Sequence, residues 1–274
     1  MLKGINQCCF PPGTSVEEVF AISKEAGFDA VELNLNEPSE VGLTMDTSAK
    51  EALEIKKMAN EIGLQLRTLS TTLLWKSPLS SSNETVRRME KKVVRKMQEI
   101  ASTMEIDTIL VVPGAVTNEL SYDVCYNNSL SAIKELSHDA EKLNVKMGIE
   151  NVWNKFLLSP LEMAAFIDAC SSSYVGAYFD VGNVLQFGYP EQWIRILNER
   201  IFKVHVKDFS TSVGNSAGFV PLLAGDVNWK RVKQALDAIN YRDTLTAELS
   251  PYHSCKRTLP IDTARHLEVI LNMN

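Results

Sequence analysis

The feature that most constrains the fold of this chain is a regular alternation of short apolar runs with longer amphipathic stretches. The apolar runs have the length and composition of buried strands, and the amphipathic stretches carry the capping residues of helices. The alternation continues from one end of the sequence to the other, without a linker or a low-complexity segment. It therefore predicts about eight strand–helix units in a single domain that covers residues 1–274.

Strands are expected in the segments Lys3–Asn6, Ala30–Leu35, Gln65–Ser70, Thr108–Val112, Val145–Asn151, Val175–Asn183, Ile201–Asp208 and Thr244–Ser250. Helices are expected over Val16–Ala26, from Thr47 or Ser48 to Ile62, and over Glu84–Met104, Tyr122–Leu143, Pro160–Cys170, Trp193–Asn198, Trp229–Ile239 and Thr263–Met273. The first helix shows the signals clearly, because Thr14 or Ser15 precedes it, Glu17 and Glu18 lie in its first turn and Gly27 follows it.

Alternating strands and helices imply parallel strands that are joined by right-handed crossovers. Eight such units in roughly 250 residues fit a closed barrel better than an open sheet. An open doubly wound sheet is the alternative, but no G-x-G-x-x-G motif follows the first strand. We therefore predict an α/β protein with the (β/α)₈ fold of a TIM barrel.

Ionisable residues end four successive strands of this predicted barrel. The fifth strand ends at Glu150, the apolar run of the sixth ends at Asp180, the seventh carries His205 and the eighth carries Glu248. A buried carboxylate is unfavourable unless it is paired or bound to a cation. Because the carboxyl ends of barrel strands meet at one face, these four side chains are expected to lie together.

Three carboxylates and one imidazole suit one divalent cation, such as Mn²⁺, Mg²⁺, Co²⁺ or Zn²⁺. Each residue also has a plainer interpretation, since a single Glu at a strand end is often a helix cap or half of an ion pair. A single His is more often a core residue with satisfied hydrogen bonds. The occurrence of all four on strands five to eight favours one metal site over four separate structural roles.

The bulk composition limits the kinds of molecule that the protein is expected to bind. A net charge of −6 argues against a non-specific nucleic-acid binder, and no apolar run approaches the roughly 20 residues of a membrane span. The five cysteines form no C-x-x-C pair, and the N-terminus lacks the pattern of a signal peptide. We expect a cytoplasmic protein that acts on a small molecule, with homo-oligomerisation left open.

Six segments of the sequence resemble the xylose isomerase-like barrel superfamily. They are GFDAVEL (Gly27–Leu33), GIEN (Gly148–Asn151), FDVGN (Phe179–Asn183), VHVKD (Val204–Asp208), AGDVNW (Ala224–Trp229) and AELS (Ala247–Ser250). Within the superfamily they most resemble sugar-phosphate isomerases and epimerases, including the ribulose- and hexulose-phosphate 3-epimerases and the tagatose 3-epimerases. The resemblance implies a metal held by Glu150, Asp180, His205 and Glu248, with Glu150 and Glu248 also acting as acid and base.

This chemistry is consistent with a ketose substrate. A cation that binds the carbonyl and the neighbouring hydroxyl stabilises the charge of a cis-enediolate as the carbinol proton leaves. Two carboxylates on opposite faces, Glu150 and Glu248, would remove one proton and deliver another, which inverts the carbon. A single base on one face would instead interconvert an aldose and a ketose. An inosose dehydratase-like lyase begins with the same proton abstraction.

The sequence departs from the pattern of the families it resembles at three places. Asn183 stands where the family often has His, Thr211 stands where free-sugar 3-epimerases have Arg, and Ala224-Gly225-Asp226 replaces a G-E-G loop. The missing Arg weakens the assignment to a free ketose and leaves a phosphorylated or carboxylated sugar open. A multinuclear zinc phosphodiesterase of the endonuclease-four type needs a site rich in histidine. It is disfavoured because the chain has four histidines, of which only His205 is expected at a strand end. A binding protein with a vestigial site is disfavoured by the intact ligand set.

Five further residues are candidates for substrate binding: Asn183, Glu32, Lys207, Trp153 and Asn151. The amide of Asn183 would bond a sugar hydroxyl, and Trp153 would form an apolar wall of the sugar pocket. Lys207 is a candidate for a phosphate, as is Lys76. For Glu32, a buried ion pair is an equally good interpretation. A lysine near a strand end is usually just solvated.

Overall fold

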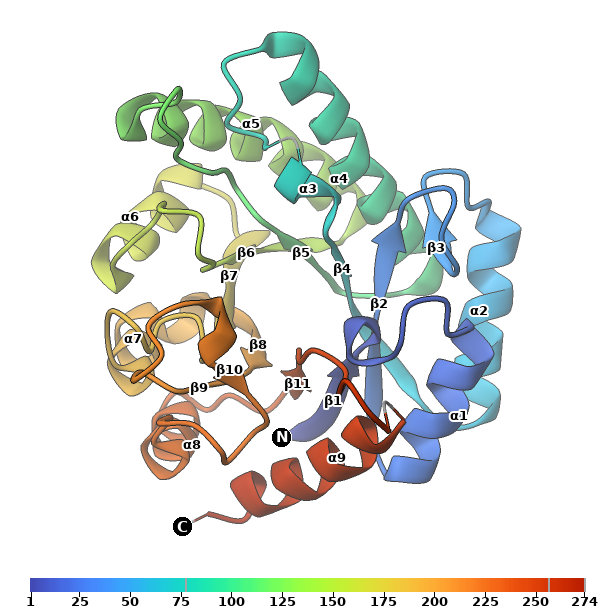
Figure 1. Cartoon of the computed structure of the whole chain (residues 1–274). Helices are drawn as coiled ribbons and strands as arrows, with labels where there is room; N and C mark the ends of the chain where they lie inside the picture. Colours follow the sequence, from blue (N-terminus) through green and yellow to red (C-terminus); the bar gives the residue numbers. More distant parts are fainter. Residues whose placement is uncertain (77, 256, 274) are drawn as a thin grey trace.

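Eight parallel strands close into a barrel in the computed structural model, which describes residues 1–76, 78–255 and 257–273 (Figure 1). The barrel strands are β1 (Leu2–Asn6), β2 (Ala30–Asn36), β4 (Gln65–Thr71), β5 (Thr108–Val111), β6 (Lys146–Glu150), β7 (Val175–Asp180), β8 (Ile201–Val206) and β11 (Thr244–Ala247). Strand β1 pairs with both β2 and β11, and these two ladders close the sheet. The predicted (β/α)₈ barrel is confirmed.

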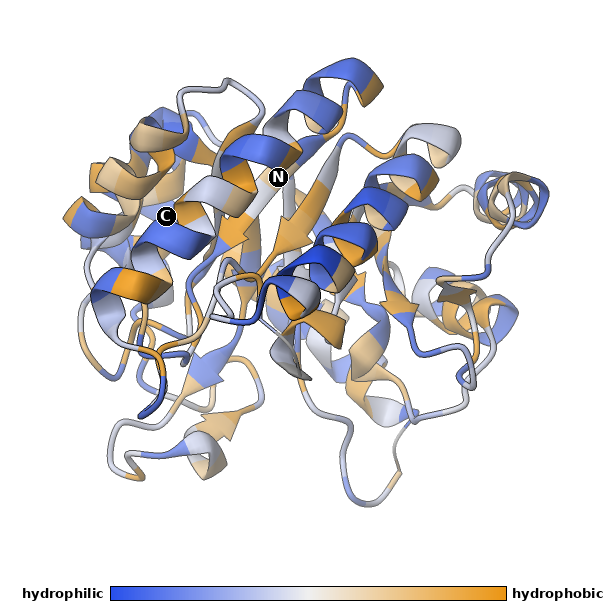
Figure 2. Ribbon diagram, turned by 90° about the horizontal axis from the view of Figure 1, so that it is seen from above, coloured by the Kyte–Doolittle hydropathy of each residue, from blue (hydrophilic) through white to orange (hydrophobic). Residues whose placement is uncertain are grey.

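A ring of helices covers the outside of the barrel (Figure 1). These helices are α1 (Val16–Ala26), α2 (Ala49–Glu61), α4 (Glu84–Met104), α5 (Tyr122–Leu143), α6 (Pro160–Cys170), α7 (Pro190–Leu197), α8 (Trp229–Ala238) and α9 (Thr258–Leu271). Hydrophobic residues gather on the strands and on the inward helix faces, while the outward faces are largely hydrophilic (Figure 2). The amphipathic pattern of the sequence therefore marks the barrel–helix interface.

Two helices begin earlier than the sequence pattern predicts. Helix α7 begins at Pro190 rather than Trp193, and α9 begins at Thr258 rather than Thr263. Both contain a proline in the first turn, Pro190 and Pro260. Proline is compatible with that turn because its N–H groups have no acceptor within the helix. None of the helices in the described residues has both the length and the apolar character needed to span a membrane.

The mouth of the barrel, meaning the carboxyl ends of its strands, carries short additional elements. Strand β3 (Leu43–Thr44) extends the sheet beside β2, α3 (Leu73–Lys76) follows β4, and β9 (Asp208–Phe209) pairs antiparallel with β10 (Phe219–Val220). The buried Asp208 carboxylate organises the β9–β10 segment. It accepts hydrogen bonds from the backbone N–H groups of Leu223 and Val227 and from the indole N–H of Trp229.

The opposite end of the barrel is closed by a network of ion pairs. The Lys203 side chain is only 2% exposed, and its Nζ lies 2.7 Å from Asp243 Oδ2 and 2.9 Å from Asp107 Oδ1. Arg67 also contacts Asp243, at 2.7 Å. A buried ammonium is tolerated only when it is paired in this way. This network lies at the amino-terminal ends of the strands. The four ionisable residues singled out at strand ends lie at the other end of the barrel, in its mouth.

One buried carboxyl, in the outer layer of helices, has no ion-pair partner among the described residues. Glu90 of α4 is 8% exposed, and its Oε2 has no hydrogen-bond partner among the described residues. Burial raises the pKa of Glu90 to about 7, with a further contribution from the carboxylate of Glu37. The folded protein therefore holds this proton more tightly than the unfolded chain does.

We expect Glu90→Gln to stabilise the protein at alkaline pH relative to the wild type. The raised pKa contributes stability that is fully present below the unfolded pKa of 4.5 and is lost as pH rises through about 7. The free energy of unfolding of the variant minus that of the wild type should grow by about 2 kcal/mol between pH 5 and pH 8.5. Urea titrations at both pH values measure this difference, and a constant difference would contradict the prediction.

Candidate metal and active site

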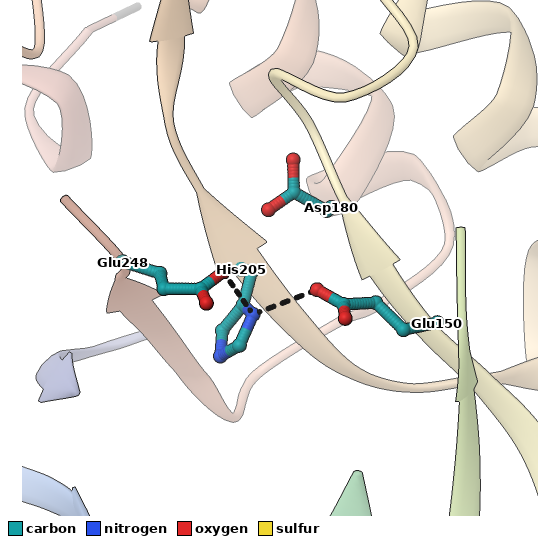
Figure 3. A group of neighbouring side chains, drawn as sticks. All are labelled: Glu150, Asp180, His205 and Glu248. Atoms are coloured by element: carbon teal, nitrogen blue, oxygen red, sulfur yellow. Dashed lines mark hydrogen bonds and ion pairs between the residues drawn. The ribbon is translucent and has the colours of Figure 1, made fainter. Parts of the chain in front are cut away.

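The four ionisable residues singled out at strand ends converge in the mouth of the barrel (Figure 3). Glu150 ends β6, Asp180 ends β7, His205 lies on β8, and Glu248 follows β11 directly. One ligand atom from each residue lies within 4.8 Å of the others. Asp180 and His205 are register partners on adjacent strands, which brings their side chains to the same face of the sheet.

His205 occupies the centre of this cluster and is fully buried. Its Nδ1 lies 3.1 Å from Glu150 Oε1 and 3.2 Å from Glu248 Oε2. Its Nε2 lies 2.7 Å from Glu32 Oε1, on the other side of the ring. Burial alone would lower the pKa of His205, but the surrounding carboxylates, with Glu32 and Glu248 foremost, raise it well above its ordinary value.

The remaining oxygens of the cluster suit a cation. Among the described residues, Asp180 Oδ2 and Glu248 Oε2 are buried and have no well-oriented hydrogen-bond donor. The Lys207 ammonium lies 2.6 Å from Glu248 Oε2 and 3.4 Å from Asp180 Oδ2, so it supplies positive charge without that geometry. Carboxylate oxygens and one imidazole nitrogen, with two oxygens lacking donors, form a donor set that fits a divalent metal ion.

The two glutamates of the cluster have opposite acid–base character. Burial raises the pKa of Glu150 to about 7, and the nearby Glu248 carboxylate adds to this effect. Burial also opposes ionisation of Glu248, but Lys207 and His205 together hold its pKa well below the usual range. Asp180 has a raised pKa, chiefly because it is buried. The surroundings therefore raise the pKa of one glutamate and lower that of the other.

Lys207 is committed to the cluster rather than free in the pocket. Burial would lower its pKa, but Asp180 and Glu248 raise it well above the ordinary value, so the ammonium keeps its proton. Its Nζ also lies 5.7 Å from the ring centroid of Phe219. The side chain of Lys76, the other candidate for a phosphate, lies outside the described part of the structure.

Glu32 lies beneath His205 and is 1% exposed. Besides the contact with His205, it accepts hydrogen bonds from the Tyr178 hydroxyl at 2.5 Å and from Asn6 Nδ2 at 2.5 Å. Burial opposes ionisation of Glu32, yet its pKa is lowered on balance because the His205 charge and these hydrogen bonds stabilise the carboxylate. The carboxylate thus has protein partners on both oxygens.

Asn151 and Asn183 tie the ends of β6 and β7 together. Asn151 bonds both the N–H and the C=O of Asp180, at 2.9 and 2.8 Å. Asn183 donates from Nδ2 to the backbone oxygen of Asn151 at 3.0 Å, and its own N–H donates to Asp180 Oδ1 at 2.7 Å. These bonds fix the orientation of the Asp180 carboxylate. A contact between either amide and substrate stays a prediction.

Two cavities open beside the cluster. The larger, of about 530 Å³, reaches Glu248 and Lys207 and is also lined by Cys8, Phe219, Tyr252 and His253. The smaller, of about 230 Å³, is mostly apolar and is lined by Asn151, Trp153, Phe156, Asn183, Phe187 and Trp193. Trp153 therefore belongs to the smaller cavity, where its ring packs against Phe187, Phe209 and Phe219.

Sequence reasoning missed Asn6 and Tyr178, which hold Glu32 in place. Asn6 ends β1, the same position on its strand that drew attention to Glu150 and Asp180. Tyr178 lies two residues before Asp180 on β7, and residues two apart on a strand share a face. Both signals are present in the sequence, since Asn6 ends its strand and Tyr178 shares a strand face with Asp180.

A protein-family model for the xylose isomerase-like TIM barrel matches residues 20–269 of the chain. The chain is 23% identical to the L-ribulose-5-phosphate 3-epimerase UlaE of Salmonella heidelberg, in an alignment that covers 87% of this chain and 83% of that protein. The superfamily resemblance drawn from the sequence motifs is therefore confirmed.

Solved structures share the fold at low sequence identity. The D-psicose 3-epimerase of Clostridium cellulolyticum H10 superposes with a TM-score of 0.83 at 15% identity, covering 100% of this chain and 99% of that one. An L-ribulose 3-epimerase superposes with a TM-score of 0.79 at 17% identity, covering 98% of this chain and 94% of that one. The matched family model spans nearly the whole chain, and this protein belongs to the xylose isomerase-like TIM-barrel family.

Proposed function

We propose that the protein is a metal-dependent sugar epimerase that inverts C3 of a ketose or ketose phosphate, with Glu150 and Glu248 as the acid–base pair. The observation that carries this proposal is the placement of the two glutamates. They reach His205 from opposite sides (Figure 3), and their pKa values are displaced in opposite directions. Titratable groups whose environments separate their pKa values are suited to opposite roles in proton transfer.

Glu150, Asp180, His205 and Glu248 are the residues that would hold the metal ion. When bound, a divalent ion supplies Lewis-acid stabilisation of negative charge on the substrate oxygens. The buried oxygens of Asp180 and Glu248 that lack oriented donors support this assignment. Asn151 binds the backbone of Asp180, and the backbone N–H of Asn183 donates to Asp180 Oδ1, so the two residues hold the carboxylate in position.

The two glutamates divide the proton transfers between them. The ionised Glu248 is suited to accept the carbinol proton from C3, while the C–H electron pair moves toward the C2 carbonyl and forms an enediolate. Glu150, whose pKa burial raises to about 7, is suited to return a proton to the other face of C3. The reverse reaction exchanges the two roles, since epimerisation is symmetric in this respect.

The larger cavity is the proposed substrate pocket, because it reaches Glu248 and Lys207 and its volume of about 530 Å³ suits a small ligand. The named relatives divide between a sugar phosphate, for UlaE, and a free sugar, for the D-psicose 3-epimerase. Both substrate classes remain within the proposal. All five cysteines are free thiols, which supports a cytoplasmic location for an enzyme of sugar metabolism.

We expect the protein to bind about one divalent ion per chain, and Lys207→Met to strengthen that binding. The Lys207 ammonium lies within the ligand cluster, so an incoming cation must compete with it. The metal-free variant should melt at a lower temperature than the wild type, and Mn²⁺, Mg²⁺, Co²⁺ or Zn²⁺ should raise its melting temperature by more. Thermal melts after chelation and after metal addition measure both effects.

Lys230→Met provides the matched control, because Lys230 is an exposed lysine of α8 outside the cluster. This variant should respond to metal as the wild type does. A wild-type protein that retains no divalent ion and keeps full activity after dialysis against a chelator would contradict the metal site.

We expect Glu150→Gln and Glu248→Gln each to fold normally and to lose activity by about 10²-fold or more, since an amide can neither accept nor deliver the proton. Circular dichroism checks the fold, and steady-state kinetics with a ketose or ketose phosphate that the wild type epimerises checks the rate. Glu90→Gln serves as the control for replacing a buried carboxyl, and its rate should match that of the wild type. A near wild-type rate in either site variant would remove that glutamate from the acid–base role.

We expect the epimerised ketose formed in D₂O to carry deuterium at C3, since the returned proton comes from a carboxyl group that exchanges with solvent. Proton and carbon NMR of the product locate the label. Deuterium at C1 together with an aldose product would instead establish an isomerase. Loss of water with a new conjugated carbonyl absorbance would establish a dehydratase. Both outcomes are compatible with the same ligand set, so the position of the label decides the reaction.

A further inference from the structure

Within the described residues, Glu32 contacts the four-residue cluster through His205, on the side of the ring that faces away from the other carboxylates. Its Oε1 lies 2.7 Å from His205 Nε2, whereas Glu150 and Glu248 approach Nδ1. Glu32 and His205 are 1% and 0% exposed. The imidazole is therefore held between carboxylates on opposite edges, and its two nitrogens have different partners.

We propose that Glu32 is a positioning residue that fixes the tautomer and the orientation of His205, so that Nδ1 faces the metal. This inference rests on the proposed metal site and assigns Glu32 a role other than the contact with substrate that the sequence suggested. With a cation in place of its second ring proton, the imidazole is neutral and carries one N–H, and an ionised carboxylate can only accept a hydrogen bond. The proton therefore stays on Nε2 beside Glu32, which leaves the Nδ1 lone pair for a cation.

Glu32 is itself held rigidly enough for this role. The Tyr178 hydroxyl donates to Oε2 and Asn6 Nδ2 donates to Oε1, each at 2.5 Å. Asn6 and Glu32 are register partners on β1 and β2, and Tyr178 comes from β7 across the barrel. The Tyr178 ring also lies 4.4 Å from the His205 ring, centroid to centroid. Groups from two other strands thus fix the Glu32 carboxylate, which in turn fixes the imidazole.

The same contacts argue against direct binding of substrate by Glu32. Both of its oxygens have protein donors, and Glu32 lines neither of the two cavities described beside the cluster. A substrate group would have to displace His205 or Tyr178 to reach it. Outer carboxylates that bond the second nitrogen of a metal-bound histidine raise its basicity and set its orientation, and Glu32 has the position that this role requires.

The test compares Glu32→Gln with Glu90→Gln, which also replaces a buried glutamate with its amide but lies outside the site. Competition with a chelating dye measures the affinity for Zn²⁺ and for Mn²⁺. We expect Glu32→Gln to weaken the affinity by about 10- to 100-fold and Glu90→Gln to leave it unchanged. Tyr178→Phe should weaken it less, and Tyr241→Phe, which removes a similar buried hydroxyl bonded to Thr244, should have no effect.

A second measurement separates positioning from a general loss of stability. Nitrogen-15 NMR of histidine-labelled protein in the presence of Zn²⁺ reports which ring nitrogen carries the proton. In the wild type, His205 should carry it on Nε2, and Glu32→Gln should introduce the Nδ1–H form because the amide group can also donate. Replacing His138, His253 and His266 one at a time assigns the His205 signals. A structural role alone would lower the melting temperature without changing this signature.

Unchanged metal affinity and an unchanged His205 tautomer in Glu32→Gln would overturn the inference while leaving the metal site intact. A wild-type protein that binds no divalent ion would overturn the metal site, and the inference with it. If Glu32→Gln does not fold, the comparison of Tyr178→Phe with Tyr241→Phe decides the matter. Equal metal affinity in those two variants would count against the role of Glu32.

Discussion

The compensation of buried negative charge is the constraint on which the rest of this site depends. Glu32, Glu150, Asp180 and Glu248 surround a single imidazole at the mouth of the barrel, and the only positive charges that the described residues place among them are those of His205 and Lys207. Carboxylates at such depth are unfavourable without cations. Burial and the neighbouring Glu248 carboxylate raise the pKa values of Glu150 and Asp180. A divalent ion bound in the cluster would stabilise the ionised forms of both carboxylates.

The barrel supplies the geometry for this concentration of charge. Parallel strands in register place Asp180 beside His205 and Glu150 beside Tyr178, and each pair faces the same side of the sheet. Bonds from Asn151 to the backbone of Asp180 then lock neighbouring strand ends together. The ion-pair network around Lys203 closes the far end of the barrel. The charged cluster therefore forms on a rigid frame, which proton transfer over short distances requires.

Unequal surroundings displace the pKa values of two chemically identical side chains in opposite directions. Glu248 lies beside the Lys207 ammonium, which lowers its pKa, whereas Glu150 is buried and has the His205 ring as its one side-chain hydrogen-bond partner among the described residues. Glu32 contacts the other nitrogen of the His205 ring. The three carboxylate roles that we propose, namely metal ligand, proton carrier and orienting group, therefore correspond to three different surroundings.

The sequence by itself determined the barrel and the four ligand candidates, because eight strand–helix units in a chain of this length fit a closed barrel better than an open sheet and parallel barrel strands end at one face. It did not determine the partners of Glu32, since Tyr178 lies 146 residues away and meets it only across the closed barrel. It also did not place Lys207 within the cluster, because a side chain beside a strand end can turn toward solvent or toward a carboxylate. Only tertiary structure decides such contacts, since they depend on the register of strands that are distant in sequence.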